Sequence, residues 1–454
     1  MFETVLVANR GEIAGRVIRT CQRLGIKAIA VYSEADAGAL HVRMADEAVL
    51  LGPPPAGESY LDAVRLIEAA KMAGAQAVHP GYGFLAENAD FARRVTAAGL
   101  AWVGPPPAAI EAMGDKVAAR NAMAAAGLPV LPGTTDPVAD VDAALAAAAR
   151  IGYPVMVKAV AGGGGIGMSA VDDEAALRSA YETARTRAER FFGSPAVFLE
   201  RYLPHTRHVE VQVLGLADGR VVALGERDCS VQRRHQKVAE ETPSPRVSPR
   251  LRERLLAAAV QAALVVDYRG AGTVECLVPE SGGDELADSF YFLEMNTRLQ
   301  VEHPVTELVT GIDLVEEQLR IAAGSPPTFD PVNLPEPAGH AIELRVYAED
   351  PRRFLPGPGT ITVWDEPVGV GIRVDAGYAA GDTVTPYYDP LMAKLCVWGA
   401  DRDDALARAR SAVASFRVEG PKCNLPFFTE LLDNADFTSG RYDTGLVPAM
   451  RQRS

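Results

Sequence analysis

The chain has 454 residues, with 45 Lys and Arg against 59 Asp and Glu, so its formal net charge is −14. This length predicts about three domains that each bury a core. The acidic balance argues against a nucleic-acid partner, because phosphate backbones are held by concentrated Lys and Arg. No run of about 18 apolar residues predicts a membrane helix. The N-terminus lacks the pattern of a signal peptide, so a cytoplasmic protein is expected.

The five cysteines are far apart, and the seven histidines are scattered. This spacing argues against a disulfide framework and against a zinc ribbon. A metal site built from histidines is not expected either. Any bound metal is therefore expected to have oxygen ligands.

The first hundred residues alternate short apolar runs, such as 4–10, 27–33 and 75–80, with amphipathic stretches at 12–24 and 60–72. Strands that alternate with helices predict βαβ units and a parallel sheet. After prolines at 105–107, a helical run is expected over 108–126.

Residues 129–204 form a small predicted α+β unit with strands at 153–160 and 196–200 and a long helix at 174–191. Beyond this unit, apolar residues recur at every second position, which is the spacing of a β-strand. The runs 208–216 and 220–226, joined by Asp218-Gly219, predict an antiparallel hairpin. After a helix over 249–266, strands at 272–278 and 290–296 are expected to pair, and a proline-rich connector at 325–337 leads into a last mixed unit.

A glycine cluster, AGGGGIGM at 161–168, follows the strand that carries Lys158. Glycines allow backbone N–H groups to approach an anion closely. The cluster is not a Walker A loop, because no Gly-Lys-Ser/Thr closes it and residues 168–171 resume a strand. We interpret it as a lid over nucleotide phosphates with Lys158 as a phosphate clamp, and a surface turn is the alternative.

Polar and apolar residues alternate along FYFLEMNTRLQVEHP at 290–304. In a strand the polar side chains would share one face, and the apolar ones, Leu293, Met295, Leu299 and Val301, the other. The polar row is Glu294, Asn296, Arg298, Gln300 and Glu302. A solvated edge strand shows the same alternation. Glu275 on the partner strand offers a second carboxylate opposite Glu294, and because magnesium takes oxygen ligands the pair predicts a metal–nucleotide site.

Five cationic or titratable residues gather in ERDCSVQRRHQK at 226–237: Arg227, Arg233, Arg234, His235 and Lys237. An ion-pair network and a site for phosphate or bicarbonate both fit this cluster. Tyr82 lies in HPGYGFLAEN at 79–88, which follows a predicted parallel strand. α/β folds bind ligands at that edge of the sheet.

Eight motifs in order resemble the biotin carboxylase family: ANRGEIA at 8–14, HPGYGFLAEN at 79–88, MGDK at 113–116, KAVAGGGGIGM at 158–168, RHVEVQV at 207–213, ERDCSVQRRHQK at 226–237, EMNTRLQVEHPVTE at 294–307 and ELRVYAEDP at 343–351. The resemblance implies a mixed α/β and α+β protein of the ATP-grasp fold. It would have a parallel, Rossmann-like domain at 1–112, an ATP-grasp domain at 113–330 with a lid at 130–204, and a mixed C-terminal domain at 331–447.

The resemblance also implies roles for individual residues. The nucleotide would be bound by Lys116, Lys158, Gly163, Gly164, Gly165, Gly167, Met168, Glu200, Leu203, His208, Gln232 and His235. Glu275, Glu294 and Asn296 would hold Mg²⁺ or Mn²⁺. Lys237, Arg298, Gln300 and Val301 would bind bicarbonate, with Glu302 as the general base, while Arg345 would stabilise the biotin enolate and Tyr82 would line the biotin pocket.

The implied reaction is the ATP-dependent carboxylation of biotin by bicarbonate through carboxyphosphate. It is the first half-reaction of an acyl-CoA carboxylase, with acetyl-CoA and fatty acid synthesis as the expected context. A urea carboxylase-like system is the alternative, because many acyl-CoA carboxylases resembling this chain carry Arg or Lys where it has Ile166. A non-biotin ATP-grasp ligase would share Lys116 and the Glu pair but gives no reason for Tyr82 or Arg345.

The sequence ends at Ser454 without a Met-Lys-Met biotinylation motif, and Lys394 in MAKLC lies in a strand-like run. Biotin is therefore expected on a separate biotin carboxyl carrier protein, and a carboxyltransferase on another chain. The family is commonly dimeric, so the resemblance also implies a homodimer.

Overall fold

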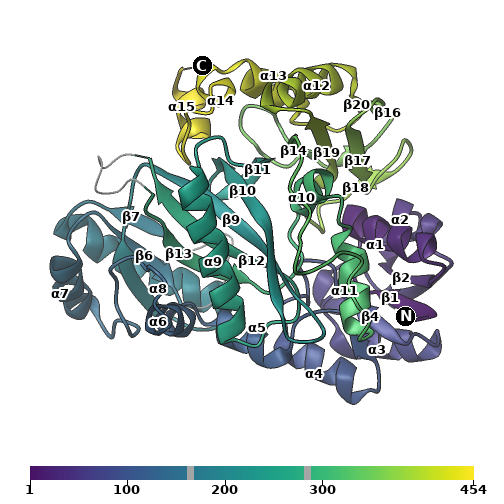
Figure 1. Ribbon diagram of the computed structural model, residues 1–454, viewed down its shortest axis with the longest axis horizontal. Helices are drawn as coiled ribbons and strands as arrows, with labels where there is room; N and C mark the ends of the chain where they lie inside the picture. Colours follow the sequence, from purple (N-terminus) through teal and green to yellow (C-terminus); the bar gives the residue numbers. More distant parts are fainter. Residues whose placement is uncertain (161–167, 281–287, 454) are drawn as a thin grey trace.

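The computed structural model describes residues 1–160, 168–280 and 288–453 (Figure 1). Its N-terminal part is a five-stranded sheet with the order β3-β2-β1-β4-β5, and every pair is parallel. The strands are β1 Thr4–Val7, β2 Lys27–Ser33, β3 Glu47–Gly52, β4 Ala77–His79 and β5 Ala101–Trp102. The helices and 3₁₀ turns are α1 Gly11–Arg23, η1 Glu34–Asp36, α2 Leu40–Met44, η2 Ala56–Glu58, α3 Ala63–Met72 and α4 Ala89–Ala97. The predicted parallel sheet is confirmed.

The helical run predicted over 108–126 is confirmed and is divided into two helices: α5 Pro107–Gly114 and α6 Lys116–Ala125. Asp115 separates them in an extended conformation. Its carboxylate accepts hydrogen bonds from the amides of Val117 and Ala118, both at 2.9 Å. An aspartate that satisfies free N–H groups in this way starts a new helix, and it places Lys116 at the first position of α6.

The small α+β unit is a three-stranded sheet in the order β7-β6-β8, covered by two helices. Its elements are β6 Val155–Ala159, β7 Ser169–Val171, β8 Val197–Arg201, α7 Val141–Ile151 and α8 Glu174–Phe192. Both helices pack on the sheet through apolar residues such as Ala144 and Leu177. The strand predicted to resume after the glycine cluster is therefore present.

The largest sheet has eight antiparallel strands in the order β13-β12-β9-β10-β11-β14-β19-β17. They are β9 Thr206–Gly215, β10 Val221–Arg233, β11 Gln236–Thr242, β12 Gly270–Pro279, β13 Tyr291–Asn296, β14 His340–Tyr347, β17 Ile372–Ala376 and β19 Leu391–Gly399. The predicted β9–β10 hairpin and the β12–β13 pair are confirmed. The sheet also continues across residue 331, from the central region into the C-terminal part of the chain.

Helices pack on this sheet and at its ends (Figure 1). They are α9 Pro249–Val265, α10 His303–Thr310, α11 Leu314–Ala322, α12 Arg402–Ser415, α13 Leu425–Asp433, α14 Ala435–Thr438 and α15 Leu446–Arg453. Four short strands complete two small ribbons: β15 Gly359–Thr360 with β18 Thr383–Val384, and β16 Val363–Asp365 with β20 Arg417–Glu419. No helix within the described ranges combines the length and apolar content needed to span a bilayer.

The strand alternation predicted through Glu302 is wrong, because β13 ends at Asn296. A bulge between the Glu275 and Cys276 pairs inserts Leu293, so Phe292 and Met295 are the residues that enter the core. Residues 297–302 form an irregular segment that leads into α10. The polar side chains of this segment therefore reach the site from a loop, and no strand face orders them.

Candidate active site

Three carboxylates on neighbouring elements surround the ammonium group of Lys237. Lys237 Nζ lies 2.5 Å from Glu210 Oε2, 2.8 Å from Glu275 Oε1 and 2.7 Å from Glu302 Oε1. A bulge in β11 inserts Val238 between the residues paired with β10 and re-aims the lysine. Burial opposes its charge, but the carboxylates outweigh burial and raise the pKa of Lys237 well above its ordinary value.

Glu302 is fully buried at the start of α10 and is held between two cations. Its second oxygen accepts a hydrogen bond from Arg345 Nη2 at 2.9 Å. Burial alone would raise the pKa of Glu302, but Lys237 and Arg345 lower it well below its ordinary value. The carboxylate is therefore ionised at neutral pH. It can accept a proton once Lys237 and Arg345 contact bound anions in its place.

Arg345 on β14 contacts a second buried carboxylate. Its Nη2 lies 2.6 Å from Glu240 Oε1, and Glu240 faces Glu343 across the β11–β14 pair. Burial, reinforced by the charge of Glu302, raises the pKa of Glu240 to about 7 although Arg345 opposes the shift. Arg345 is thus a fixed cation whose guanidinium is oriented from two sides.

Glu275 and Glu294 stand opposite each other on β12 and β13, as predicted. Asn296 Nδ2 donates a hydrogen bond to Glu275 Oε1 at 2.9 Å, and Lys116 Nζ donates one to Glu294 Oε2 at 2.5 Å. Two carboxylates and an amide oxygen are a donor set that suits Mg²⁺. The residues therefore fit a hard cation, which would compete with Lys116 and Lys237 for the carboxylate oxygens.

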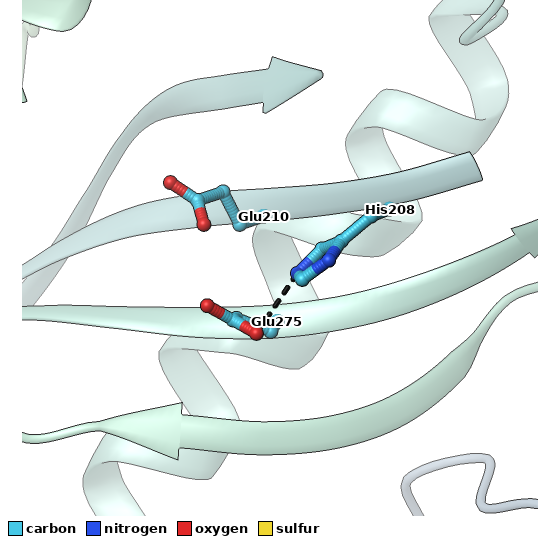
Figure 2. A group of neighbouring side chains, drawn as sticks. All are labelled: His208, Glu210 and Glu275. Atoms are coloured by element: carbon cyan, nitrogen blue, oxygen red, sulfur yellow. Dashed lines mark ion pairs between the residues drawn. The ribbon is translucent and has the colours of Figure 1, made fainter. Parts of the chain in front are cut away.

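Glu275 also contacts His208, and Figure 2 shows this ion pair with Glu210 beside it. His208 Nε2 lies 2.8 Å from Glu275 Oε2, and Gln232 Nε2 donates to His208 Nδ1 at 2.8 Å. Ligand atoms of His208, Glu210 and Glu275 gather within 4.8 Å. Because Lys237 already neutralises Glu210, we interpret this group as an ion-pair network. We expect the metal cation to bind the carboxylate oxygens of Glu275 and Glu294.

The residues expected at the nucleotide lie partly on the lid. Lys158 on β6 forms a short ion pair with Glu200 on β8, and both side chains are buried. Leu203 is half-buried just beyond β8, and Met168 is half-buried just before β7. The glycines expected to contact phosphate, Gly163, Gly164, Gly165 and Gly167, and the neighbouring Ile166 lie outside the described residues.

The bicarbonate candidates lie in the irregular segment after β13. Arg298 Nε donates to Glu87 Oε2 at 2.8 Å, and its Nη1 donates to Gln300 Oε1 at 2.8 Å. Gln300 Nε2 donates to Glu275 Oε1 at 3.3 Å, which joins this segment to the Lys237 cluster. The segment is thus fixed by side-chain contacts where strand pairing is missing.

Val301 and Tyr82 meet at the buried Lys394. The carbonyl of Val301 accepts a hydrogen bond from Lys394 Nζ at 2.9 Å. The same ammonium lies 5.8 Å from the centre of the Tyr82 ring, and Asn9 Nδ2 donates to the backbone carbonyl of Tyr82 at 2.7 Å. The tyrosine loop after β4 therefore borders the segment that carries Glu302.

Two arginines of the cationic cluster predicted at 226–237 form ion pairs, as the first interpretation expected. Arg227 is buried and donates to Glu210 Oε1 at 2.6 Å, and Arg233 pairs with Glu349. These two arginines belong to the ion-pair network. His235 lies in the β10–β11 turn with a φ of 66° and keeps part of its surface exposed. The partial burial of its ring, together with the charge of Lys158, lowers its pKa.

The sequence did not predict three side chains that contact candidate site residues: Glu87, Glu240 and Lys394. Glu87 orients Arg298, Glu240 contacts Arg345, and Lys394 contacts the Val301 carbonyl. Charged residues inside otherwise apolar strands, as in VAEET and MAKLCV, were an available signal, because buried charges are rare unless they are paired.

The chain matches three family descriptions: Biotin carboxylase, N-terminal domain, over residues 1–110; Carbamoyl-phosphate synthase L chain, ATP binding domain, over 115–328; and Biotin carboxylase C-terminal domain over 343–449. It is 52% identical to biotin carboxylase 2 of Bacillus subtilis over 98% of this chain and 99% of the relative. It is 49% identical to a pyruvate carboxylase subunit from Methanothermobacter thermautotrophicus over 100% of this chain and 91% of the relative.

Among solved structures, the biotin carboxylase domain dimer of Hydrogenobacter thermophilus 2-oxoglutarate carboxylase, in complex with MgADP, ADP and bicarbonate, has a TM-score of 0.94 and 44% identity. The match covers 99% of this chain and 98% of that one. Fold and site together define an ATP-grasp ligase. The chain belongs to the biotin carboxylase family, and its activity is the ATP-dependent carboxylation of biotin.

Proposed function

We propose that this chain transfers carboxyl groups from bicarbonate to biotin on a separate carrier protein, and that the residues described above carry the reaction. The observation that supports this most is the buried Glu302, ionised and held between Lys237 and Arg345. One carboxylate next to two cations suits the deprotonation of an anionic substrate that the same cations bind.

In the first step, Lys237, Arg298, Gln300 and the backbone of Val301 bind bicarbonate. Glu302 accepts the proton of bicarbonate while a bicarbonate oxygen attacks the γ-phosphorus of ATP, and ADP leaves. Carboxyphosphate is the product. Lys116 and Lys158 exchange their carboxylate partners for ATP phosphates and spread the transferred charge. Glu275, Glu294 and Asn296 would hold Mg²⁺, or Mn²⁺ in its place, and the bound ion would supply positive charge that stabilises the phosphoryl group.

The second step breaks the C–O bond of carboxyphosphate and yields carbon dioxide and phosphate. Phosphate accepts the ureido N–H proton of biotin, and the nitrogen attacks carbon dioxide to form carboxybiotin. Arg345 stabilises the negative oxygen of the biotin enolate, because its guanidinium is already fixed by Glu240 and Glu302. Tyr82 lines the biotin pocket. Adenosine is contacted by Glu200, Leu203, His208, Gln232 and His235, and the lid glycines close over the phosphates.

Acetyl-CoA is the final acceptor that we propose, with the carboxyltransferase on another chain and fatty acid synthesis as the setting. Relatives with similar identity include subunits of pyruvate carboxylase and of methylcrotonoyl-CoA carboxylase, and a urea carboxylase-like system is the second candidate. We further propose the domain limits 1–112, 113–330 and 331–447, a homodimer, and a cytoplasmic location, which the five cysteines outside disulfides support.

The test is to follow ADP release with ATP and Mg²⁺ while bicarbonate and free biotin are varied. ADP release is expected to require bicarbonate and to rise when free biotin is added. An ADP release that is indifferent to both would contradict the proposed reaction.

A further inference from the structure

An arginine-lined pocket of about 420 Å³ lies between the β10–β11 turn, the loop after β14 and α15. Its guanidinium groups come from three separate parts of the chain: Arg233 and Arg234 at the β10–β11 turn, Arg352 and Arg353 after β14, and Arg451 on α15. Such a concentration of arginine is unexpected in a chain with a net charge of −14. The mechanism proposed above uses none of these five residues.

Two of the arginines have their charges compensated and form the inner wall. Arg233 is buried, pairs with Glu349, and lies 5.2 Å from the centre of the Phe354 ring. Arg451 lies 5.3 Å from the centre of the same ring and pairs with Glu430 at 2.5 Å. These contacts fix the wall and give each of its two arginines a carboxyl partner.

The other three arginines, Arg234, Arg352 and Arg353, are exposed, and within the described residues their side chains have no acidic partner. We call them the basic rim. The backbone amides of Arg352 and Arg353 donate to Asp350 Oδ1 at 3.0 and 2.9 Å, which fixes their loop. The other oxygen of Asp350 pairs with Lys422 at 2.9 Å, so Asp350 does not cancel the rim charge.

The inner wall of the pocket is linked to Arg345 through Tyr347. Arg345 and Tyr347 lie two residues apart on β14 and share a face, about 7 Å apart along a strand. The Tyr347 ring lies 5.5 Å from Arg233, and its hydroxyl accepts a hydrogen bond from Gln236 at 3.2 Å. On the adjoining strand, Lys237 follows the turn that carries Arg234. Tyr347 therefore links the Arg233 wall of the pocket to the strand that carries Arg345, and the β10–β11 turn links the rim to the strand that carries Lys237.

We propose that the basic rim binds an acidic face of the protein that carries biotin, and holds it while biotin reaches Arg345 and Glu302. This proposal rests on the proposed function. The rim arginines project to solvent with Leu355, which is 51% exposed, and a mixed basic and apolar surface suits a protein partner. Complementary charge would speed encounter and fix the orientation of the carrier.

The experiment measures carboxylation of two substrates, free biotin and a biotinylated bacterial carrier domain of net negative charge that the wild-type chain carboxylates. In R352E/R353E, the KM for the carrier is expected to rise about tenfold, while kcat/KM for free biotin stays within twofold. Added NaCl should raise the carrier KM of the wild type more than that of the variant. The control R93E/R94E makes the same charge change on α4, at the opposite end of the view from α15 (Figure 1), and should leave both substrates unaffected.

An unchanged KM for the carrier would overturn the proposal. An equal loss with free biotin would also overturn it and assign the rim to the reaction chamber. A rise in the KM for ATP without a change for the carrier would point to a small phosphate ligand instead. If charge reversal impairs folding, R352Q/R353Q should still raise the carrier KM about threefold. A wild-type chain that carboxylates neither substrate would contradict the proposed function itself, whatever the rim does.

Discussion

The two sides of the site differ in how their cations are paired. On the nucleotide side, Lys116 and Lys158 each contact one carboxylate at short range, Glu294 and Glu200. On the reaction side, Lys237 contacts three carboxylates and Glu302 contacts two cations. A single partner is exchanged easily for a phosphate of ATP, whereas a network of buried charges fixes geometry before substrate arrives. The nucleotide side is thus suited to exchanging carboxylate partners for phosphates, and the reaction side holds its charged groups in place before substrate binds.

Removing Lys237 should have the largest effect, because it leaves Glu210, Glu275 and Glu302 buried without their shared cation. Lys237→Met is expected to lower the free energy of unfolding by about 3–5 kcal/mol. Lys116→Met should cost under about 1 kcal/mol, since Glu294 is half-buried and has one cation. Urea denaturation of both variants measures the difference, and equal losses would break the comparison.

Removing Lys158 should weaken ATP binding and leave the reaction side intact. Lys158→Gln is expected to raise the KM for ATP about tenfold to a hundredfold, because a charge-assisted contact to phosphate is lost. The KM for bicarbonate should stay within twofold. Steady-state kinetics with each substrate varied in turn give both values, and a bicarbonate KM that rises as much as that of ATP would contradict the division into two sides.

Glu240 should give the smallest effect, and one that depends on pH. Its pKa in the folded chain is raised to about 7, so the native state favours the protonated form, and that contribution to stability is lost as pH rises through 7. Because the loss begins near the unfolded pKa of about 4.5, Glu240→Gln should already be more stable than the wild type at pH 6, and its advantage should grow by about 1 kcal/mol between pH 6 and pH 8. Thermal unfolding at both pH values measures this, and a constant difference would show that Glu240 does not titrate there.

Local patterns predicted the parts of the fold that local chemistry determines. Asp218-Gly219 between alternating runs predicted the β9–β10 hairpin, and alternation on two strands placed Glu275 opposite Glu294. The break at Asp115 was also readable in the sequence, because aspartate before Lys116 is a helix cap.

The pairing of distant strands was not readable in the same way. Glu240 and Glu343 face each other across β11 and β14 although about a hundred residues separate them in sequence, and a register between remote strands leaves no local pattern. The bulges at Val238 and Leu293 each insert one residue, so the side chains beyond them point to the opposite face from the one that strict alternation predicts. For this reason the sequence grouped the right polar residues but put Glu302 on a strand face, whereas it lies at the start of a helix.

The most direct measurement is the transfer of label from ¹⁴C-bicarbonate to free biotin by the wild type and by Glu302→Gln, with ATP binding measured in parallel. We expect ATP-dependent labelling by the wild type and a loss of at least about a hundredfold in the variant, because the general base is gone. The affinity for ATP should stay within twofold. Labelling by Glu302→Gln at the wild-type rate, or a loss explained by failed ATP binding, would contradict the role given to this carboxylate.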